Sequence, residues 1–320
     1  MNSKLIEEIP SLDLEQFRDP ATKNEFAQQL GNGFSNIGFL SIKNHYLSDQ
    51  LADQLYKDFE AFFALGEDVK QKYYLPDLHG QRGYVPKRQE NAKGAAQPDL
   101  KEFFHIGQIG KDNDLEEFGY PQNIWPEEVE NLRLSASRAF EALEKTGFEV
   151  LEAIAIYLKL PQNYFREKSN NGNSILRAIH YFPLDVNDLE DGSVRAGAHG
   201  DINLITLLMG ASAEGLEVQR IDGTWIPVTA LPDQLIVNVA DMLERLTNGV
   251  LKSTIHRVVN PPLNKLNTSR YSMPFFMHPQ SSMNLTCLEG CISDDNPKKF
   301  DDITAGDFLI ERLKEIGLIK

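Results

Sequence analysis

Apolar residues in the first third of the chain repeat at helical spacing. Phe26, Leu30 and Phe34 lie four residues apart, and a second stripe runs from Leu51 to Phe62 at intervals of four, four and three. Residues three and four apart share one face of a helix, so both segments are predicted to be helical. Between them, residues 37–42 are rich in β-forming side chains and indicate a short strand.

The middle of the chain alternates between irregular and strongly periodic segments. Residues 75–125 are rich in Gly, Pro, Asp and Asn without a sustained period, which predicts long irregular structure. A long helix follows, because apolar residues recur at intervals of three and four from Phe140 to Leu158, and Pro161 marks its end. A closing helix is predicted from about Ala305 to Leu318.

From about residue 174 the pattern changes to short β-rich runs separated by turn residues. Six candidate strands cover Ile175–Phe182, Leu204–Met209, Leu216–Ile221, Leu235–Val239, Ser253–Val259 and Arg270–Phe276. A turn at Asp222 and Gly223 predicts a hairpin with residues 225–228. Short strands at this spacing are typical of a sandwich or jelly roll, so the fold class is predicted to be α+β, with helices before and after a β core.

Composition and charge exclude several classes of function. No apolar run of about 18 residues occurs, and residues 1–8 lack the apolar stretch of a secretory signal, so neither a membrane span nor secretion is expected. The formal charge of −15 would repel a nucleic-acid backbone, so no nucleic-acid partner is expected. Cys287 and Cys291 are too few for a disulfide framework, and we expect reduced thiols in a cytoplasmic protein.

Three residues of the β half form a candidate metal site. His199 and Asp201 are two positions apart, which on an extended segment places both side chains on one face. His256, 55 positions after Asp201 in another β-rich run, offers a third ligand. Two His and one carboxylate on one octahedral face leave three positions open, as in non-haem Fe(II) oxygenases. The same residues would also suit Zn²⁺, so a zinc hydrolase is an alternative.

A candidate carboxylate clamp follows the metal residues. Arg270 and Ser272 are again two positions apart and share one face of a predicted strand. A guanidinium pairs with both oxygens of a carboxylate, and the hydroxyl adds another donor. A zinc hydrolase would leave this pair unexplained, and a catalytically silent metal-binding protein would have no need of both the metal triad and the clamp.

Taken together, these motifs resemble the iron(II)/2-oxoglutarate-dependent oxygenases, specifically the isopenicillin N synthase-like group. The likeness extends over nearly the whole chain, through residues 9–13, 36–45, 83–84, 101–104, 199–208, 215–218, 238–241, 247–249, 253–261 and 270–272. It implies a double-stranded β-helix (jelly-roll) core with a helical N-terminal region and a C-terminal helix. It also implies that His199, Asp201 and His256 hold iron, and that Arg270 and Ser272 bind the distal carboxylate of 2-oxoglutarate.

The resemblance divides the chain into four expected regions. These are an N-terminal helical leader at 1–125, a spine helix at 126–172, the β-helix core at 173–280 and a closing strand and helix at 281–320.

One segment departs from the family pattern. Many plant members carry Asn-Tyr-Tyr-Pro where this chain has His180-Tyr-Phe-Pro183. The Asn and the second Tyr of that pattern face the cosubstrate, so His180 and Phe182 are predicted to take their places, with loss of the tyrosine hydroxyl. Together with Tyr84 and Phe275, these two residues are predicted to form walls of the substrate pocket.

The resemblance implies an enzyme that uses Fe(II), 2-oxoglutarate and O₂. It would hydroxylate, desaturate or cyclise a small organic molecule, with CO₂ and succinate as co-products. Two alternatives share the fold: an isopenicillin N synthase-type oxidase that does not use 2-oxoglutarate, and a non-catalytic metal- or ligand-binding relative. The sequence leaves the primary substrate and the oligomeric state open.

Overall fold

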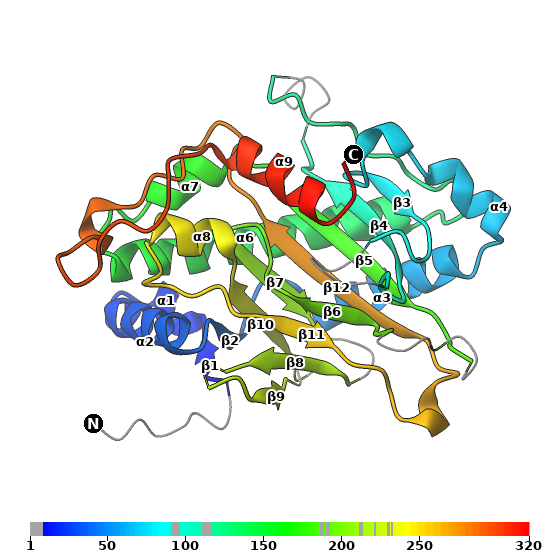
Figure 1. The fold of residues 1–320 in the computed structure, drawn as a ribbon, viewed down its shortest axis with the longest axis horizontal. Helices are drawn as coiled ribbons and strands as arrows, with labels where there is room; N and C mark the ends of the chain where they lie inside the picture. Colours follow the sequence, from blue (N-terminus) through cyan, green and yellow to red (C-terminus); the bar gives the residue numbers. More distant parts are fainter. Residues whose placement is uncertain are drawn as a thin grey trace.

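Two β-sheets and a layer of helices form the protein in a computed structural model (Figure 1). The structure describes residues 9–90, 97–110, 117–185, 189, 193–210, 214–220, 222–228, 231 and 233–319. Residues 1–8, on which the argument against a secretory signal rested, lie outside the described residues.

Within the described residues the major sheet has eight strands, and of these only β1 and β2 pair in parallel. In spatial order the strands are β1 (Ser11–Asp13), β2 (Phe39–Lys43), β10 (Gln234–Val239), β7 (Ile205–Met209), β12 (Arg270–Met277), β5 (Ile175–Tyr181), β4 (Glu102–Gly107) and β3 (Gly83–Val85). The minor sheet consists of β6 (Ala196–His199), β11 (His256–Val258), β8 (Leu216–Gln219) and β9 (Trp225–Pro227). This pair of sheets is the double-stranded β-helix that the family resemblance implies.

Helices cover the outer face of the major sheet. Their bounds are α1 (Glu15–Arg18), α2 (Lys23–Asn36), α3 (Asp49–Phe63), α4 (Glu67–Lys70), α6 (Leu132–Tyr157), α7 (Tyr164–Ser169), α8 (Asp241–Leu246) and α9 (Ala305–Glu315). Short 3₁₀ helices lie at Gln71–Tyr73, Pro76–Leu78, Leu263–Lys265 and Glu289–Cys291. The long helix α6 passes behind the sheet in Figure 1, and its Phe140 packs edge-on against Phe275 of β12.

Side chains that alternate between the two faces of each strand contribute to two separate apolar cores. On β5, Leu176 and Ala178 join the core between the major sheet and the helices. Their neighbours Ile179 and Tyr181 instead join a second core that lies between the two sheets. Because successive strand residues point to opposite faces, a side chain's position in the sequence decides which core it enters.

The main elements that the periodicity predicts are confirmed, with differences at their ends and in elements that were missed. The long helix ends at Tyr157, before Pro161, and all six predicted strands occur with shifted ends. Strand β6 was missed because its sequence, Ala-Gly-Ala-His, contains no strong β-forming residue. Strands β3 and β4 lie within the region predicted to be irregular, and they are strands because they extend the major sheet beyond β5.

Candidate active site

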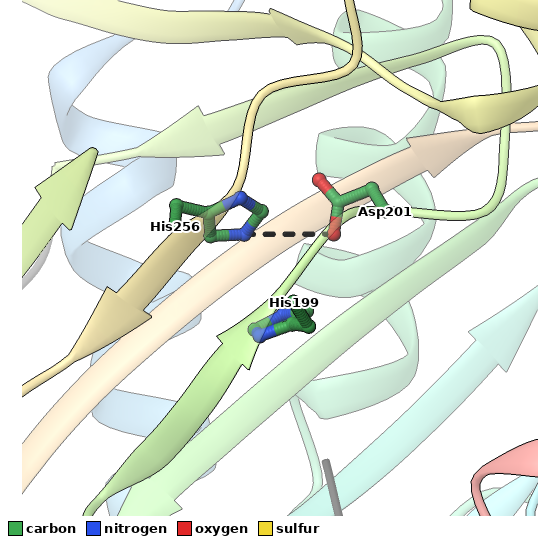
Figure 2. Close-up of side chains that lie close together, drawn as sticks. All are labelled: His199, Asp201 and His256. Atoms are coloured by element: carbon green, nitrogen blue, oxygen red, sulfur yellow. Dashed lines mark ion pairs between the residues drawn. The ribbon is translucent and has the colours of Figure 1, made fainter. Parts of the chain in front are cut away.

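The three candidate metal ligands converge on the minor sheet (Figure 2). His199 ends β6 and His256 begins β11, and the two residues are direct cross-strand partners with ring centroids 4.5 Å apart. Asp201 follows two residues after His199, and its Oδ1 lies 3.7 Å from Nε2 of His256. One ligand atom from each residue lies within 4.8 Å of the other two.

Backbone carbonyls orient both imidazoles. Nδ1 of His199 lies 2.7 Å from the Gly197 carbonyl oxygen, and Nδ1 of His256 lies 3.2 Å from that of Thr254. A ring that donates through Nδ1 keeps the lone pair of Nε2 for a metal. Burial, with the neighbouring His256, lowers the pKa of His199 to about 4, so this ring is neutral at pH 7.

Asp201 is held as a carboxylate by two donors. Its Oδ2 accepts hydrogen bonds from Oγ1 of Thr206 at 2.7 Å and from Nδ2 of Asn238 at 2.8 Å. Burial alone would raise its pKa, but the two imidazoles and these hydrogen bonds lower it overall. Two imidazoles and one ionised carboxylate form a donor set that fits a divalent metal such as Fe(II).

The triad opens onto a cavity between the two sheets. The described residues that line it are Phe39, Lys101, Arg177, Ile179, Tyr181, Ala196, His199, Asp201, Thr206, Leu208, Leu216, Asn238, His256, Val258, Arg270, Ser272, Pro274 and Phe276. Thr206, Asn238, Lys101, Arg177 and Tyr181 were missed as site residues, although the first three stand within the segments 199–208, 238–241 and 101–104 that carry the family resemblance. The structure therefore places the predicted triad and the predicted clamp in one cavity.

The clamp residues lie along β12 on the cavity side. Arg270 is 1% exposed and pairs with Tyr181 of β5, while Ser272 pairs with Ile179. The Nε of Arg270 donates to the Glu214 carbonyl oxygen at 3.2 Å, and its Cζ lies 4.9 Å from the centroid of the Tyr181 ring. A buried guanidinium at the cavity wall is suited to hold a carboxylate.

The four predicted pocket walls lie elsewhere, which is a correction. Phe275 packs on α6, and Tyr84 donates its hydroxyl to Glu102 while its ring contacts Phe62 of α3. The described residues that line the cavity include neither of them. The reason is that side chains alternate between the two faces of a strand. Both of these side chains occupy the face of the major sheet that the helices cover.

His180 and Phe182 also lie away from the cavity, for the same reason. Nδ1 of His180 lies 2.8 Å from Oε1 of Glu102, and its ring stacks on Tyr271 with centroids 4.8 Å apart. Phe182 belongs to a small separate cluster with Leu100. Neither side chain is among the described cavity residues.

Tyr181, which lies between His180 and Phe182 in the chain, is the residue of this segment that lines the cavity. Successive residues of a strand point to opposite faces, so Tyr181 and its neighbours His180 and Phe182 cannot share one face. Cross-strand pairing with Arg270 places Tyr181 on the clamp side. The departure from the plant pattern therefore leaves a tyrosine next to the clamp.

Comparison with known proteins agrees with this geometry. Residues 9–128 match the family described as non-haem dioxygenase in morphine synthesis N-terminal, and residues 172–279 match the 2OG-Fe(II) oxygenase superfamily. The proline hydroxylase buaE of Petromyces alliaceus is 32% identical over 96% of this chain and 98% of its own length. The 2-oxoglutarate-Fe(II) type oxidoreductase ppzD of Metarhizium majus is 29% identical over 95% of this chain and 94% of its own.

Solved structures share the fold over nearly the full length. A 2OG-Fe(II) oxygenase family protein from Caulobacter crescentus has a TM-score of 0.86 at 41% identity, covering 97% of this chain and 100% of that one. A full-length Neurospora crassa protein in complex with alpha-KG has a TM-score of 0.85 at 28% identity, covering 98% of both chains. No helix in the part of the chain that the structure describes has the length and apolar character of a membrane span. The chain thus belongs to the isopenicillin N synthase-like group of iron(II)/2-oxoglutarate-dependent oxygenases, enzymes that use Fe(II) and 2-oxoglutarate.

Proposed function

We propose that His199, Asp201 and His256 hold the iron and that Arg270 and Ser272 bind the distal carboxylate of 2-oxoglutarate. The observation that carries this proposal is that all five side chains line one cavity between the sheets. Bound Fe(II) and 2-oxoglutarate supply the chemistry by which O₂ oxidises a C–H bond of a small organic substrate, with CO₂ and succinate as co-products.

The metal residues are prepared for binding at neutral pH. His199 is neutral because of its lowered pKa, and Asp201 is ionised, so neither has to lose a proton before it accepts a metal. The carbonyls of Gly197 and Thr254 fix the rotation of the two rings. Thr206 and Asn238 would fix the carboxylate in the same way.

The clamp residues would orient the cosubstrate. The guanidinium of Arg270 supplies charge-assisted hydrogen bonds and Ser272 a hydroxyl donor, both from the same face of β12. The hydroxyl of Tyr181, on the strand beside Arg270, is a further donor for the same carboxylate. The apolar walls that Phe39 and Leu216 contribute would keep water from this end of the cavity.

The reaction and the class of substrate are part of the proposal. Named relatives include a proline hydroxylase, and the Neurospora crassa protein was also solved with thymine, so relatives act on or bind small polar molecules. For this chain we propose a small molecule, with hydroxylation, desaturation or cyclisation as the outcomes at the oxidised carbon. A cytoplasmic location is proposed as well, supported by the free thiols of Cys287 and Cys291.

Single-ligand variants test the proposed site. His199→Ala and His256→Ala should lose iron retention and the release of succinate from 2-oxoglutarate, as measured by metal analysis and mass spectrometry. The control is His79→Asn, because His79 is away from the cavity and has a positive φ of 49° that Asn tolerates. An iron-loaded, active His199→Ala enzyme would overturn the ligand assignment.

A further inference from the structure

Asp201 lies outside the strands that carry the other two proposed metal ligands, on the coil that follows β6 (Figure 2). His199 ends β6 and His256 begins β11, so strand pairing fixes these two residues relative to each other. Residues 200–204 belong to no helix or strand, and neither do residues 252–255, which lead into β11. The carboxylate of Asp201 therefore depends on contacts from other elements for its place beside the imidazoles.

The start of α8 holds the segment that carries Asp201. The backbone N–H of Asp241 donates to the Asp201 carbonyl oxygen at 2.9 Å. The next N–H, that of Met242, donates to the carbonyl oxygens of Ile202 and Asn203 at 3.2 and 3.1 Å. The first N–H groups of a helix have no acceptor within the helix, so they are free to bind a neighbouring segment. Three consecutive carbonyls of the Asp201 segment are thus fixed to the start of α8.

The side chain of Asp241 reaches the segment that precedes His256. Its Oδ1 accepts a hydrogen bond from Oγ of Ser253 at 2.6 Å. Ser253 is followed by Thr254, whose carbonyl oxygen lies 3.2 Å from Nδ1 of His256. Asp241 is therefore bonded through its backbone to one ligand-bearing segment and through its carboxylate to the other.

Gly200 shows how closely this hydrogen bond packs against the metal residues. A Cβ at position 200 would lie 3.0 Å from both Oδ1 of Asp241 and Oγ of Ser253. That distance is tighter than an ordinary van der Waals contact, so a side chain at this position would require one of the two oxygens to shift. The Asp241–Ser253 hydrogen bond thus lies directly against the backbone between His199 and Asp201.

We propose that Asp241 is a positioning residue that, through Ser253, sets the spacing of Asp201 and His256 for the metal. This inference rests on the proposed function, because it concerns the same metal ligands. Neither Asp241 nor Ser253 is among the described residues that line the cavity, so the pair acts through the ligands and not on a bound small molecule. Loss of a residue that orients a metal ligand lowers metal affinity by about 10- to 100-fold, and a contact one step further away should give the lower value.

The rival explanation is that Asp241 only stabilises the start of α8. A carboxylate in the first turn of a helix interacts favourably with the helix dipole, whatever lies beside it. Asp241→Ala would then lower stability, whereas removal of the Ser253 hydroxyl, which is not part of α8, would leave metal binding unchanged. Ser253→Ala separates the two explanations because it keeps Asp241 in place, and it also keeps the test decisive if Asp241→Ala does not fold.

The test is an anaerobic Fe(II) titration of each variant against a competing chelator, without 2-oxoglutarate. We expect Ser253→Ala and Asp241→Ala each to raise the Kd for Fe(II) about tenfold. The double variant should raise it no further than the larger single effect, because both changes remove the same hydrogen bond. An unchanged Kd in Ser253→Ala, or additive effects in the double variant, would overturn the inference.

A conservative variant and a matched control narrow the interpretation. Asp241→Asn keeps an oxygen that can accept from Ser253, so it should bind Fe(II) nearly as the wild type does, and a Kd as high as that of Asp241→Ala would overturn the positioning role. The control is Ser135→Ala, because Ser135 of α6 also donates its hydroxyl to a buried carboxylate, that of Asp58 in α3. Neither control residue is among the described cavity residues, so this variant should lose stability and keep its Kd.

Cobalt gives a readout that a loss of stability alone would not change. The visible absorption of Co(II) bound at saturation reports the geometry of its ligands, so it should shift in Ser253→Ala and stay unchanged in Ser135→Ala. An unchanged spectrum in Ser253→Ala would overturn the inference.

His256→Ala distinguishes the possible failures. If this variant binds Fe(II) as the wild type does, the proposed ligand assignment fails, and the positioning role fails with it. If it loses Fe(II) while Ser253→Ala and Asp241→Ala bind normally, the positioning role alone fails.

Discussion

Replacement of Thr206 by Val tests how the carboxylate of the metal site is held. The substitution removes one hydroxyl and keeps the shape of the side chain, which is 2% exposed. That hydroxyl donates to Oδ2 of Asp201 at 2.7 Å. Without it, Asn238 is the one described side chain that still donates a hydrogen bond to this carboxylate oxygen. We therefore expect weaker metal binding with little change in the fold.

The expected size follows from the chemistry of the lost hydrogen bond. A hydrogen bond to a charged group contributes about 1.5–3 kcal/mol, and each 1.4 kcal/mol corresponds to a factor of ten in affinity. The loss of the Thr206 bond should therefore raise the Kd for Fe(II) about 10- to 100-fold. Loss of a partner that orients a metal ligand typically has an effect of the same size.

The assay is an anaerobic Fe(II) titration against a competing chelator at fixed 2-oxoglutarate. Thr247→Val is the matched control, because Thr247 is also buried and its hydroxyl donates at 2.8 Å to the Leu243 carbonyl in α8, away from the triad. The control should lose stability but bind Fe(II) as the wild type does. An unchanged Kd in Thr206→Val, or an equal loss in Thr247→Val, would refute the reasoning.

Three further predictions concern the clamp, strand parity and pH. Arg270→Ala should raise the Kd of 2-oxoglutarate by an amount equivalent to about 2–5 kcal/mol, measured by equilibrium titration of the iron-loaded enzyme, and an unchanged Kd would contradict the clamp. Tyr181→Phe should weaken 2-oxoglutarate binding in the same titration whereas Phe182→Tyr should not tighten it, and the reverse result would place Phe182 rather than Tyr181 at the clamp. Burial lowers the pKa of His278 to about 4, so between pH 6.5 and 4 the unfolded chain takes up a proton that the native state does not. Stability should fall across this range by up to about 3 kcal/mol for this group, and His278→Gln should reduce that fall in urea denaturation; an identical pH slope in the variant would exclude this contribution.

Local patterns were sufficient to predict the residues that meet at the triad. The prediction of His199 and Asp201 required only that side chains alternate along an extended segment. The prediction of His256 required only that it lies in another β-rich run. The structure makes the two histidines cross-strand partners, which a single sequence does not specify, since pairing between strands is a long-range choice.

The pocket walls could not be predicted because they depend on which face of its strand each side chain occupies. The prediction for residues 180 and 182 rested on a four-residue family pattern, whereas the pairing of β5 with β12 turns Tyr181 toward the cavity. Arg177 was not singled out, and Lys101 was noted only as part of the segment 101–104 that carries the family resemblance. Their partner Glu90 lies in a region without periodicity, and the ion pairs form only when the fold brings β4 and β5 together.

The most direct test is the visible spectrum of the enzyme on anaerobic addition of 2-oxoglutarate to the Fe(II) form. A 2-oxo acid chelated to Fe(II) gives a weak metal-to-ligand charge-transfer band, and the measurement needs no knowledge of the primary substrate. The proposed site predicts that the band appears with the wild-type enzyme and is absent in His256→Ala. Iron binding without the band in the wild-type enzyme would contradict the assignment of the cavity to 2-oxoglutarate.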